Sequence, residues 1–424
     1  MRLLRTILAL MPCGKPQAAH FAHVTELLQW LPGRLNFTGL EHYGGRSART
    51  HARWFARPFP FARLAVAALA AVHPRVPEGL GELLVLDASF VSKSGRGTWG
   101  AGWFWSGMAR AVRWGMEVTL LAAVDVEEGG AYPLCARQSP GTVRARRQTC
   151  GAATGRATTV EVGLSLLREA VAAGAKDSLG ARWMAADGGY ASRTFVEGVR
   201  ALDLHAVGRL RKDAVLRFPY TGRHERRPGR RRQFDGRFDR RDPSHLACTT
   251  LDDEEVDLYH GVLHGKAWQC WLQVVYVLPR GADPQTTEGV LLYSTDLDLA
   301  PEHIFRLYGA RFQIEFAFRD AKQHLGLNDG QARSQAKLHF HFNIGFAALF
   351  WARLQARLQA ERPLGPFSLR HRKRHNLEAE IYKRIAARSG AGPNATNSEG
   401  RRHRIPPQRL WLRAPPLEPG PTRP

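Results

Sequence analysis

The sequence has no long apolar run, few cysteines and a shortage of acidic residues. Its longest apolar stretches, residues 64–72 and 344–352, are about half as long as the roughly 20-residue run that a membrane-spanning helix needs. The five cysteines form no C-x-x-C pair, which argues against a zinc site, and an odd number argues against a disulfide framework. We therefore expect a cytoplasmic protein with reduced thiols and no membrane partner.

Basic residues outnumber acidic residues by a wide margin. The chain has 61 Lys and Arg against 38 Asp and Glu, a formal net charge of +23 and a pI near 10.7. Such an excess favours nucleic acid as a partner, through phosphate neutralisation and counterion release. Charge says nothing about catalysis, so a purely architectural DNA-binding protein remains an alternative.

Four unlike polar side chains share one stripe of a predicted helix. At about 100° per residue, Arg311, Glu315 and Lys322 lie roughly 300°, 340° and 320° around the helix from Tyr308, so all four point within an arc of roughly 60°. A carboxylate flanked by a phenol, a guanidinium and an ammonium suits a metal site beside bound phosphates. The alternative is a solvated helix face on which Glu315 pairs with Arg311 and Arg319.

Two apolar runs each lead to an aspartate. GELLVLDAS reads as a buried strand with Asp87 near its end, and ARWMAADGGYA repeats the pattern with Asp187. In α/β proteins, active sites commonly lie at the ends of the sheet strands, so acidic side chains at such positions are candidate catalytic residues. A strand-end cap at Asp87 and an Asp-Gly turn at Asp187 are the alternatives. Together with Glu315, these residues have the oxygen ligands that two Mg²⁺ ions require.

The order of the three acids and the pattern Y-x2-R-x3-E-x6-K resemble the DDE transposases of bacterial insertion sequences. The pattern is met by Tyr308, Arg311, Glu315 and Lys322. The resemblance implies an α/β fold: a ribonuclease H-like mixed sheet flanked by helices, with a mostly β insertion domain and an N-terminal helical region.

The same resemblance implies roles for these residues. Asp87, Asp187 and Glu315 would be catalytic and bind two Mg²⁺ ions, for which Mn²⁺ could substitute. The other three residues of the pattern, Tyr308, Arg311 and Lys322, would hold DNA phosphates. Arg319 lies at the edge of the stripe and could add a contact.

The activity implied is two-metal phosphodiester hydrolysis and transesterification on double-stranded DNA. The enzyme would cut at terminal inverted repeats and transfer the freed 3′-hydroxyl to target DNA. Cutting two ends together calls for two active sites, so we expect a homodimer on DNA, associated with the bacterial nucleoid. A catalytically inactive or architectural DNA-binding protein derived from a transposase is the alternative.

Composition and pattern predict five regions. They are an N-terminal helical region that binds DNA ends (1–78), the first part of the catalytic core (79–210), a mostly β insertion with a basic loop (211–288), the second part of the core with the Glu315 helix (289–388), and a disordered basic Pro-rich tail (389–424).

Some local patterns leave alternatives open. Ser47 is predicted to cap a short helix whose Arg49 and Arg53 face DNA, although a packing role for this helix is equally open. In the insertion, Trp268 and Trp271 could receive a flipped base or belong to the core.

Overall fold

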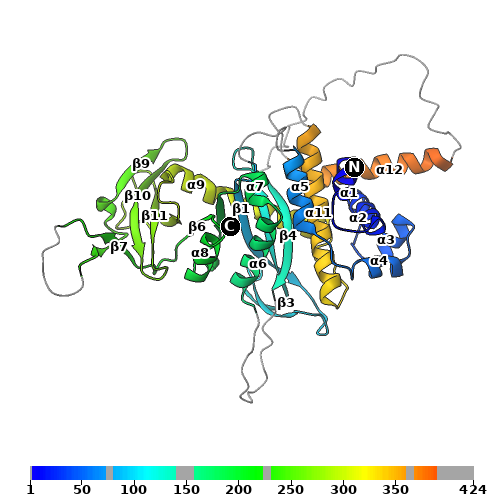
Figure 1. Cartoon of the computed structure of the whole chain (residues 1–424), viewed down its shortest axis with the longest axis horizontal. Helices are drawn as coiled ribbons and strands as arrows, with labels where there is room; N and C mark the ends of the chain where they lie inside the picture. The colour runs from blue at the N-terminus through cyan, green and yellow to red at the C-terminus, as the bar shows by residue number, and fades with distance from the viewer. Residues whose placement is uncertain (1, 73–79, 140–156, 223–230, 360–366, 389–424) are drawn as a thin grey trace, which may run out of the picture. The chain divides into compact units, whose positions relative to one another are not determined.

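The computed structural model describes residues 2–72, 80–139, 157–222, 231–359 and 367–388 (Figure 1). The chain divides into a compact unit, Met1–Leu377, and a second unit, Glu378–Pro424. The tail predicted for residues 389–424 lies outside the described residues, as does part of the basic loop, residues 223–230. Nowhere in the described ranges is there a helix with the length and apolarity that a bilayer crossing requires.

The sheet begins with five strands in the order β4-β3-β1-β5-β6. β3 runs antiparallel to both β1 and β4, whereas β5 is parallel to β1 and to β6. This mixed order, with helices on both faces, confirms the predicted ribonuclease H-like α/β class. The bounds are β1 Leu83–Ser92, β3 Ala111–Val124, β4 Ala131–Ser139, β5 Trp183–Ala186 and β6 His205–Arg209.

The same sheet continues through the region predicted to be a β insertion. β12 pairs with β6, and the order then runs β11-β10-β7-β8. β9 pairs with the first half of β10, on the same edge as β7. The mostly β character predicted for residues 211–288 is therefore confirmed. The bounds are β7 Leu216–Pro219, β8 Phe234–Arg237, β9 Ala247–Leu251, β10 Val256–Gly265, β11 Cys270–Pro279 and β12 Val290–Ser294.

Helices cover the two faces of β1. Gly163 of α6 lies against the Leu86 side chain, where a Cβ atom would clash unless Leu86 shifted, so glycine favours this close approach. The next residue, Asp87, meets the opposite layer that contains α10, because successive side chains of a strand point to opposite faces. The helices that follow β4 in the chain are α6 Thr159–Ala172, α7 Ala175–Leu179, α8 Arg193–Arg200, α9 Pro301–Ala310, α10 Gln313–His324, α11 Gln335–Gln359 and α12 Leu369–Arg388.

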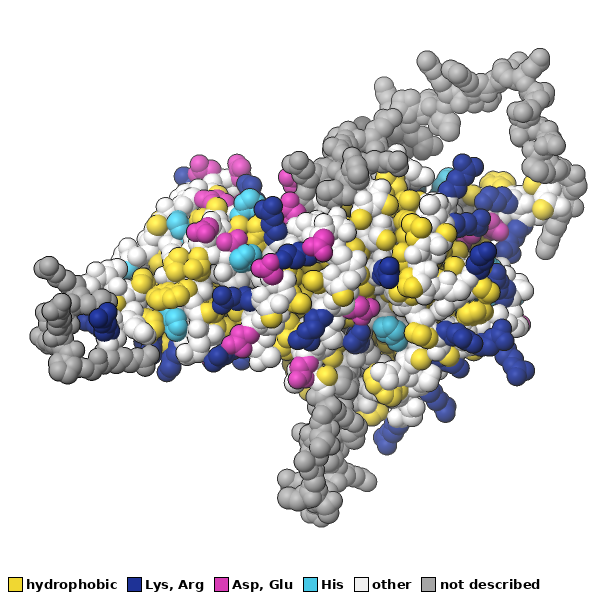
Figure 2. Space-filling model, viewed as in Figure 1, with side chains coloured by type: hydrophobic (Ala, Val, Ile, Leu, Met, Phe, Trp, Pro, Cys, Tyr) yellow, Lys and Arg dark blue, Asp and Glu magenta, His cyan; other side chains and the backbone are white. Residues whose placement is uncertain are grey.

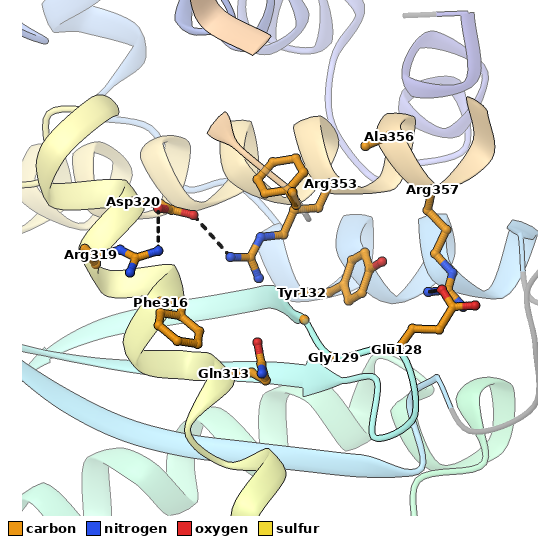
Figure 3. Close-up of a pocket in the computed structure, with 12 residues that line it drawn as sticks. Glu128, Gly129, Tyr132, Gln313, Phe316, Arg319, Asp320, Arg353, Ala356 and Arg357 are labelled. Carbon is orange, nitrogen blue, oxygen red and sulfur yellow. Dashed lines mark hydrogen bonds and ion pairs between the residues drawn. The ribbon is translucent and has the colours of Figure 1, made fainter. Parts of the chain in front are cut away.

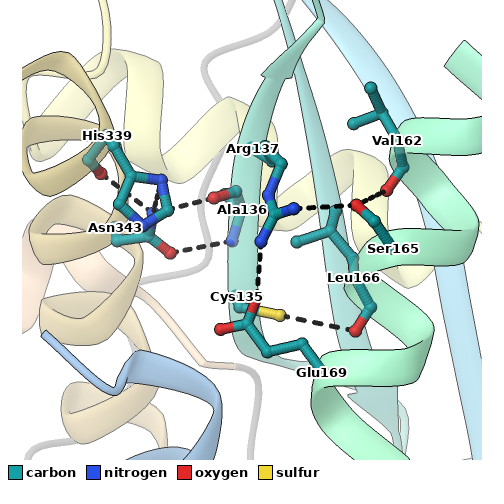
Figure 4. A network of polar contacts seen from close by, with 9 residues as sticks. All are labelled: Cys135, Ala136, Arg137, Val162, Ser165, Leu166, Glu169, His339 and Asn343. Atoms are coloured by element: carbon teal, nitrogen blue, oxygen red, sulfur yellow. Dashed lines mark hydrogen bonds and ion pairs between the residues drawn. The ribbon is translucent and has the colours of Figure 1, made fainter. Parts of the chain in front are cut away.

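The sequence pattern does not predict β4, which lies at an edge of the sheet. Asn343 of α11 completes its hydrogen bonding: the amide oxygen accepts from the Ala136 N–H and the amide nitrogen donates to the Ala136 carbonyl, both at 2.8 Å (Figure 4). On the neighbouring residue, Arg137 donates to Ser165 and Glu169 of α6. One strand is thus tied to helices on both faces.

The N-terminal helices pack against α11. Ser47 caps α4 as predicted, accepting a hydrogen bond from the Thr50 N–H. Within this bundle, the rings of His20 and His51 are buried and share a hydrogen bond of 3.1 Å. The bounds are α1 Arg2–Ala9, α2 Lys15–Leu28, α3 Phe37–Gly44, α4 Ala48–Trp54 and α5 Phe61–Val72.

These buried histidines should make the fold sensitive to acid. Burial lowers the pKa of His20 to about 3, and that of His51 and His341 to about 4. A lowered folded-state pKa gives stability that is present above the unfolded value of 6.5 and is lost as pH falls toward 4. We expect urea unfolding to report a loss of about 1–2 kcal/mol per histidine between pH 7 and pH 5.

The variant His341→Gln provides the control. Its amide can still donate to the Gly326 carbonyl, which the ring nitrogen meets at 2.9 Å, but it cannot titrate. The acid sensitivity should therefore shrink in this variant. Equal stability of the wild-type protein at pH 7 and pH 5 would contradict the assignment.

Candidate active site

The predicted helix of the Y-x2-R-x3-E-x6-K pattern is in fact two helices, α9 and α10. Between them the chain makes tighter turns: the Arg311 N–H donates to the Tyr308 carbonyl and the Glu315 N–H to the Phe312 carbonyl, each three residues back. The prediction of one long helix is thus wrong at this point, because hydrogen bonds of the 3₁₀ type interrupt the α pattern. The side chains of the pattern nevertheless still turn toward β1.

Arg311 is the centre of this group. Its guanidinium lies 3.8 Å from an Asp87 carboxylate oxygen and 3.3 Å from one of Glu315. The same guanidinium stacks over the Tyr308 ring, 5.5 Å from its centroid. The predicted Arg311–Glu315 pair therefore exists, but it is part of a larger cluster that joins β1 to both helices. Only 12% of the Arg311 side chain and 21% of the Asp87 side chain are exposed, so water screens this pair poorly.

Asp87 is a largely buried carboxyl, and its neighbours compensate only part of the cost of its negative charge. Burial is the main reason why the pKa of this carboxyl is raised to about 6; the hydrogen bond from the Ala88 N–H and the charge of Arg311 oppose the rise, and the carboxylates of Asp187 and Glu315 add to it. A buried carboxylate with two further carboxylates nearby favours a bound cation. Lys322 adds positive charge on the same side and donates to the Ser89 hydroxyl at 2.8 Å.

Asp187 lies at the end of β5, directly before the short 3₁₀ helix Gly188–Tyr190. Its carboxylate acts on the Tyr308 phenol, whose pKa is raised by burial and by this negative charge, while Arg311 and Arg209 oppose the rise. Asp87 and Asp187 occupy neighbouring parallel strands, so both meet at the carboxyl edge of the sheet.

Arg319 points away from this cluster. Its guanidinium stacks over Phe316, 4.6 Å from the ring centroid, and lies 3.7 Å from Asp320 rather than beside Glu315 (Figure 3). Asp320 is shared with the buried Arg353 at 3.2 Å. These side chains line a cavity of about 330 Å³ on the other side of α10. The tertiary structure thus separates Arg319 from the other three predicted DNA contacts.

Two residues that the sequence pattern does not single out join the site. Ser89 follows Asp87 by two positions, and the period-two rule for strands could have placed it on the same face. Arg209 ends β6, the strand next to β5, and its charge acts on Tyr308. Its position, as a basic residue at the end of the strand parallel to β5, could have indicated that Arg209 belongs to the site.

The two tryptophans of the insertion have different environments. Trp268 is buried in the core. Trp271 is partly exposed on β11, where it packs against Phe234 and His264. Among these two, only Trp271 has an accessible face on which a base could stack.

The acidic residues fit a divalent cation by the chemistry of their donors. Hard ions such as Mg²⁺ prefer carboxylate oxygens and are commonly held by one or two carboxylates together with substrate phosphates. Among the described residues no group of three or more Asp, Glu, His or Cys side chains is close enough to hold one ion by itself. The arrangement therefore fits an ion shared with a phosphate, rather than a site closed by protein ligands alone.

Comparison with known proteins agrees with this geometry. A family model described as DDE superfamily endonuclease matches residues 41–262, which include the strands that carry Asp87 and Asp187 but end before Glu315. The chain has no match among curated proteins. The family implies a DNA substrate, nuclease activity and the use of divalent metals. Because the match covers more than half of its 424 residues, the chain belongs to the DDE superfamily endonucleases.

Proposed function

We propose that this endonuclease is the transposase of a bacterial insertion sequence. It would cut double-stranded DNA at the terminal inverted repeats of its element and transfer the freed 3′-hydroxyl to target DNA. The observation that carries the proposal is the contact of one guanidinium, that of Arg311, with both Asp87 and Glu315. A nuclease without this pattern would have acids at the site but no such arginine next to the glutamate helix.

Asp87, Asp187 and Glu315 would hold two Mg²⁺ ions, with Mn²⁺ as a substitute. When bound, the ions would supply Lewis-acid stabilisation at phosphorus and activate water or a 3′-hydroxyl. The protein's own residues would position the DNA. Arg311 offers a planar fork to a phosphate and Lys322 a point charge, while the half-buried Tyr308 phenol, whose pKa is raised, stays protonated and can donate.

Other parts of the chain would bind DNA farther from the cut. We assign end binding to residues 1–78, where Arg49 and Arg53 are exposed on α4. Lys and Arg side chains gather over α3 and α4 in Figure 2. Residues 79–210 and 289–388 would form the catalytic core, 211–288 the insertion, and 389–424 a basic tail. Two chains would act together on two ends, on nucleoid DNA.

The test is cleavage of a duplex that reproduces the DNA flanking the coding frame. We expect strand cutting at the inverted repeat with Mg²⁺ or Mn²⁺ and none with EDTA. The alternative, an inactive or architectural DNA-binding protein, predicts binding without cutting under any metal condition. Binding without cutting would therefore replace the proposed function by this alternative.

Lys322→Ala should weaken binding of the end duplex and flatten its salt dependence. Loss of one phosphate contact reduces the slope of log K against log salt concentration by about one. Fluorescence anisotropy over a salt series measures this slope. The matched control is Lys176→Ala, since Lys176 of α7 precedes β5 at the opposite edge of the sheet and pairs with Asp203. Equal slopes for the two variants would remove Lys322 from the DNA contacts.

A further inference from the structure

A hairpin with an unusually apolar surface extends from the catalytic sheet. It consists of β2, Gly102–Ser106, and the first part of β3, joined by a short turn. Trp103 is 45% exposed, Trp105 63%, Val112 56%, and Met108 in the turn 94%. Solvent-exposed tryptophans and methionines in such a group mark an interaction surface. We call Trp103, Trp105, Met108 and Val112 the hairpin patch.

Strand register places the hairpin patch on the same side of the sheet as the catalytic carboxylate. Asp87 is opposite Leu120 on β3, and Trp105 is opposite Val112 farther along the same strand. Leu120 and Val112 are an even number of residues apart, so their side chains share a face. Trp103, opposite Trp114 and packed edge-on against it, lies on that face as well.

The charge around the patch has one sign. Residues 88–116 contain Lys93, Arg96, Arg110 and Arg113 but no Asp or Glu. Arg110 and Arg113 are exposed within the hairpin itself. Two copies of such a hairpin would repel each other if they met face to face, whereas a polyanion would be attracted. Charge complementarity therefore favours nucleic acid over a second copy as the occupant.

We propose that the hairpin patch is an apolar wedge that enters double-stranded DNA and unstacks a base step. Arg110 and Arg113 would neutralise the phosphates on either side, and Trp105 and Met108 would occupy the opened step. Exposed apolar side chains flanked by arginines are the means by which proteins kink a duplex. The proposal rests on the proposed function, because it requires the same DNA to pass over Asp87.

The strand register of β3 also predicts the position of the unstacked base step in the DNA. Eight residues of β3 separate Leu120 from Val112, which at about 3.4 Å per residue is roughly 27 Å. At about 3.4 Å per base pair this corresponds to roughly eight base pairs. The opened step should thus lie nearly one helical turn from the phosphate that is cut.

The experiment places 2-aminopurine at successive positions of the flanking-DNA duplex and records its emission on binding, with EDTA present to prevent cutting. We expect emission to rise at one step about eight base pairs from the cut. The double variant Trp105→Ser with Met108→Ser should abolish that rise and weaken binding about tenfold, as expected for the loss of stacking. Trp105→Phe with Met108 intact should retain most of the signal.

The control is Leu297→Ser, which removes an exposed leucine, 39% accessible, from a loop outside the hairpin. It should leave both emission and affinity unchanged. If wild-type protein binds and cuts DNA but no position brightens, the wedge is refuted while the proposed function stands. If wild-type protein binds no DNA, the proposed function fails with it. A double variant that changes only the mass of the protein assembly would assign the patch to a protein contact instead.

Discussion

Replacing Asp87 by Asn should abolish DNA cleavage and at the same time stabilise the metal-free fold at alkaline pH. In the proposed function Asp87 holds a catalytic ion, and loss of such a carboxylate should reduce the cleavage rate by about a thousandfold or more. The gain in stability follows from the pKa of Asp87, which is raised from 3.8 to about 6, first by burial. Cleavage of the end duplex and urea unfolding at pH 8 measure the two effects.

The sign follows from the direction of the shift. A raised folded-state pKa means that the fold gains from the protonated carboxyl below pH 3.8 and loses this gain as pH rises through about 6. At pH 8 the ionised group costs about 2–3 kcal/mol, and an uncharged amide avoids that cost. The side chain is 21% exposed, so solvent screening reduces this figure only modestly.

Asp177→Asn is the matched control, because Asp177 is an exposed carboxylate on α7. Cleavage and stability should both stay as in the wild-type protein. Asp187→Asn and Glu315→Gln should also abolish cleavage while DNA binding persists. Full metal-dependent cutting by any of the three site variants would remove that residue from the catalytic group.

Arg357→Leu should be the most destabilising single change considered for this fold, with a loss of about 3–5 kcal/mol. Only 4% of the Arg357 side chain is exposed, and its guanidinium lies 2.7 Å from Asp125, which is 3% exposed. The same guanidinium pairs with Glu128 and so ties the β3–β4 turn to α11. Its removal leaves Asp125 buried without a countercharge. Denaturant unfolding of the full chain measures the loss.

A double variant separates this explanation from a simple packing defect. In Arg357→Leu with Asp125→Asn the buried charge is gone, so at least half of the lost stability should return. Arg319→Leu is the control, since the Arg319 side chain is 55% exposed and its pair should contribute less than about 1 kcal/mol. Unchanged instability in the double variant would show that packing, not charge, causes the effect.

The strands that could be predicted are those in which an uninterrupted run of apolar residues indicates a buried strand. Residues 83–86 and 290–294 are of this kind and form parts of β1 and β12. β4 could not be predicted, because Pro133 and Arg137 interrupt its apolar pattern. It is a strand because β3 pairs with one edge and Asn343, more than 200 residues later, bonds to Ala136.

The candidate site also has features that could be predicted from the sequence and features that could not. The spacing from Tyr308 to Lys322 predicted side chains that face one region, and they do so although the helix is interrupted at Arg311 and Phe312. Spacing could not show that Arg319 turns toward Phe316 and Asp320, because its position at the edge of the stripe allowed either direction.

The sequence by itself determined the order of the three acids, the basic character of the chain and the periodicity of its main strands and helices. These are properties of neighbours along the chain, which set local geometry and net charge. Only the tertiary structure decided that Arg311 meets Asp87, that Lys322 meets Ser89, and that the hairpin patch shares a face with the carboxylate. Those contacts join distant segments, and the pairing of strands and packing of helices that create them depend on the whole fold.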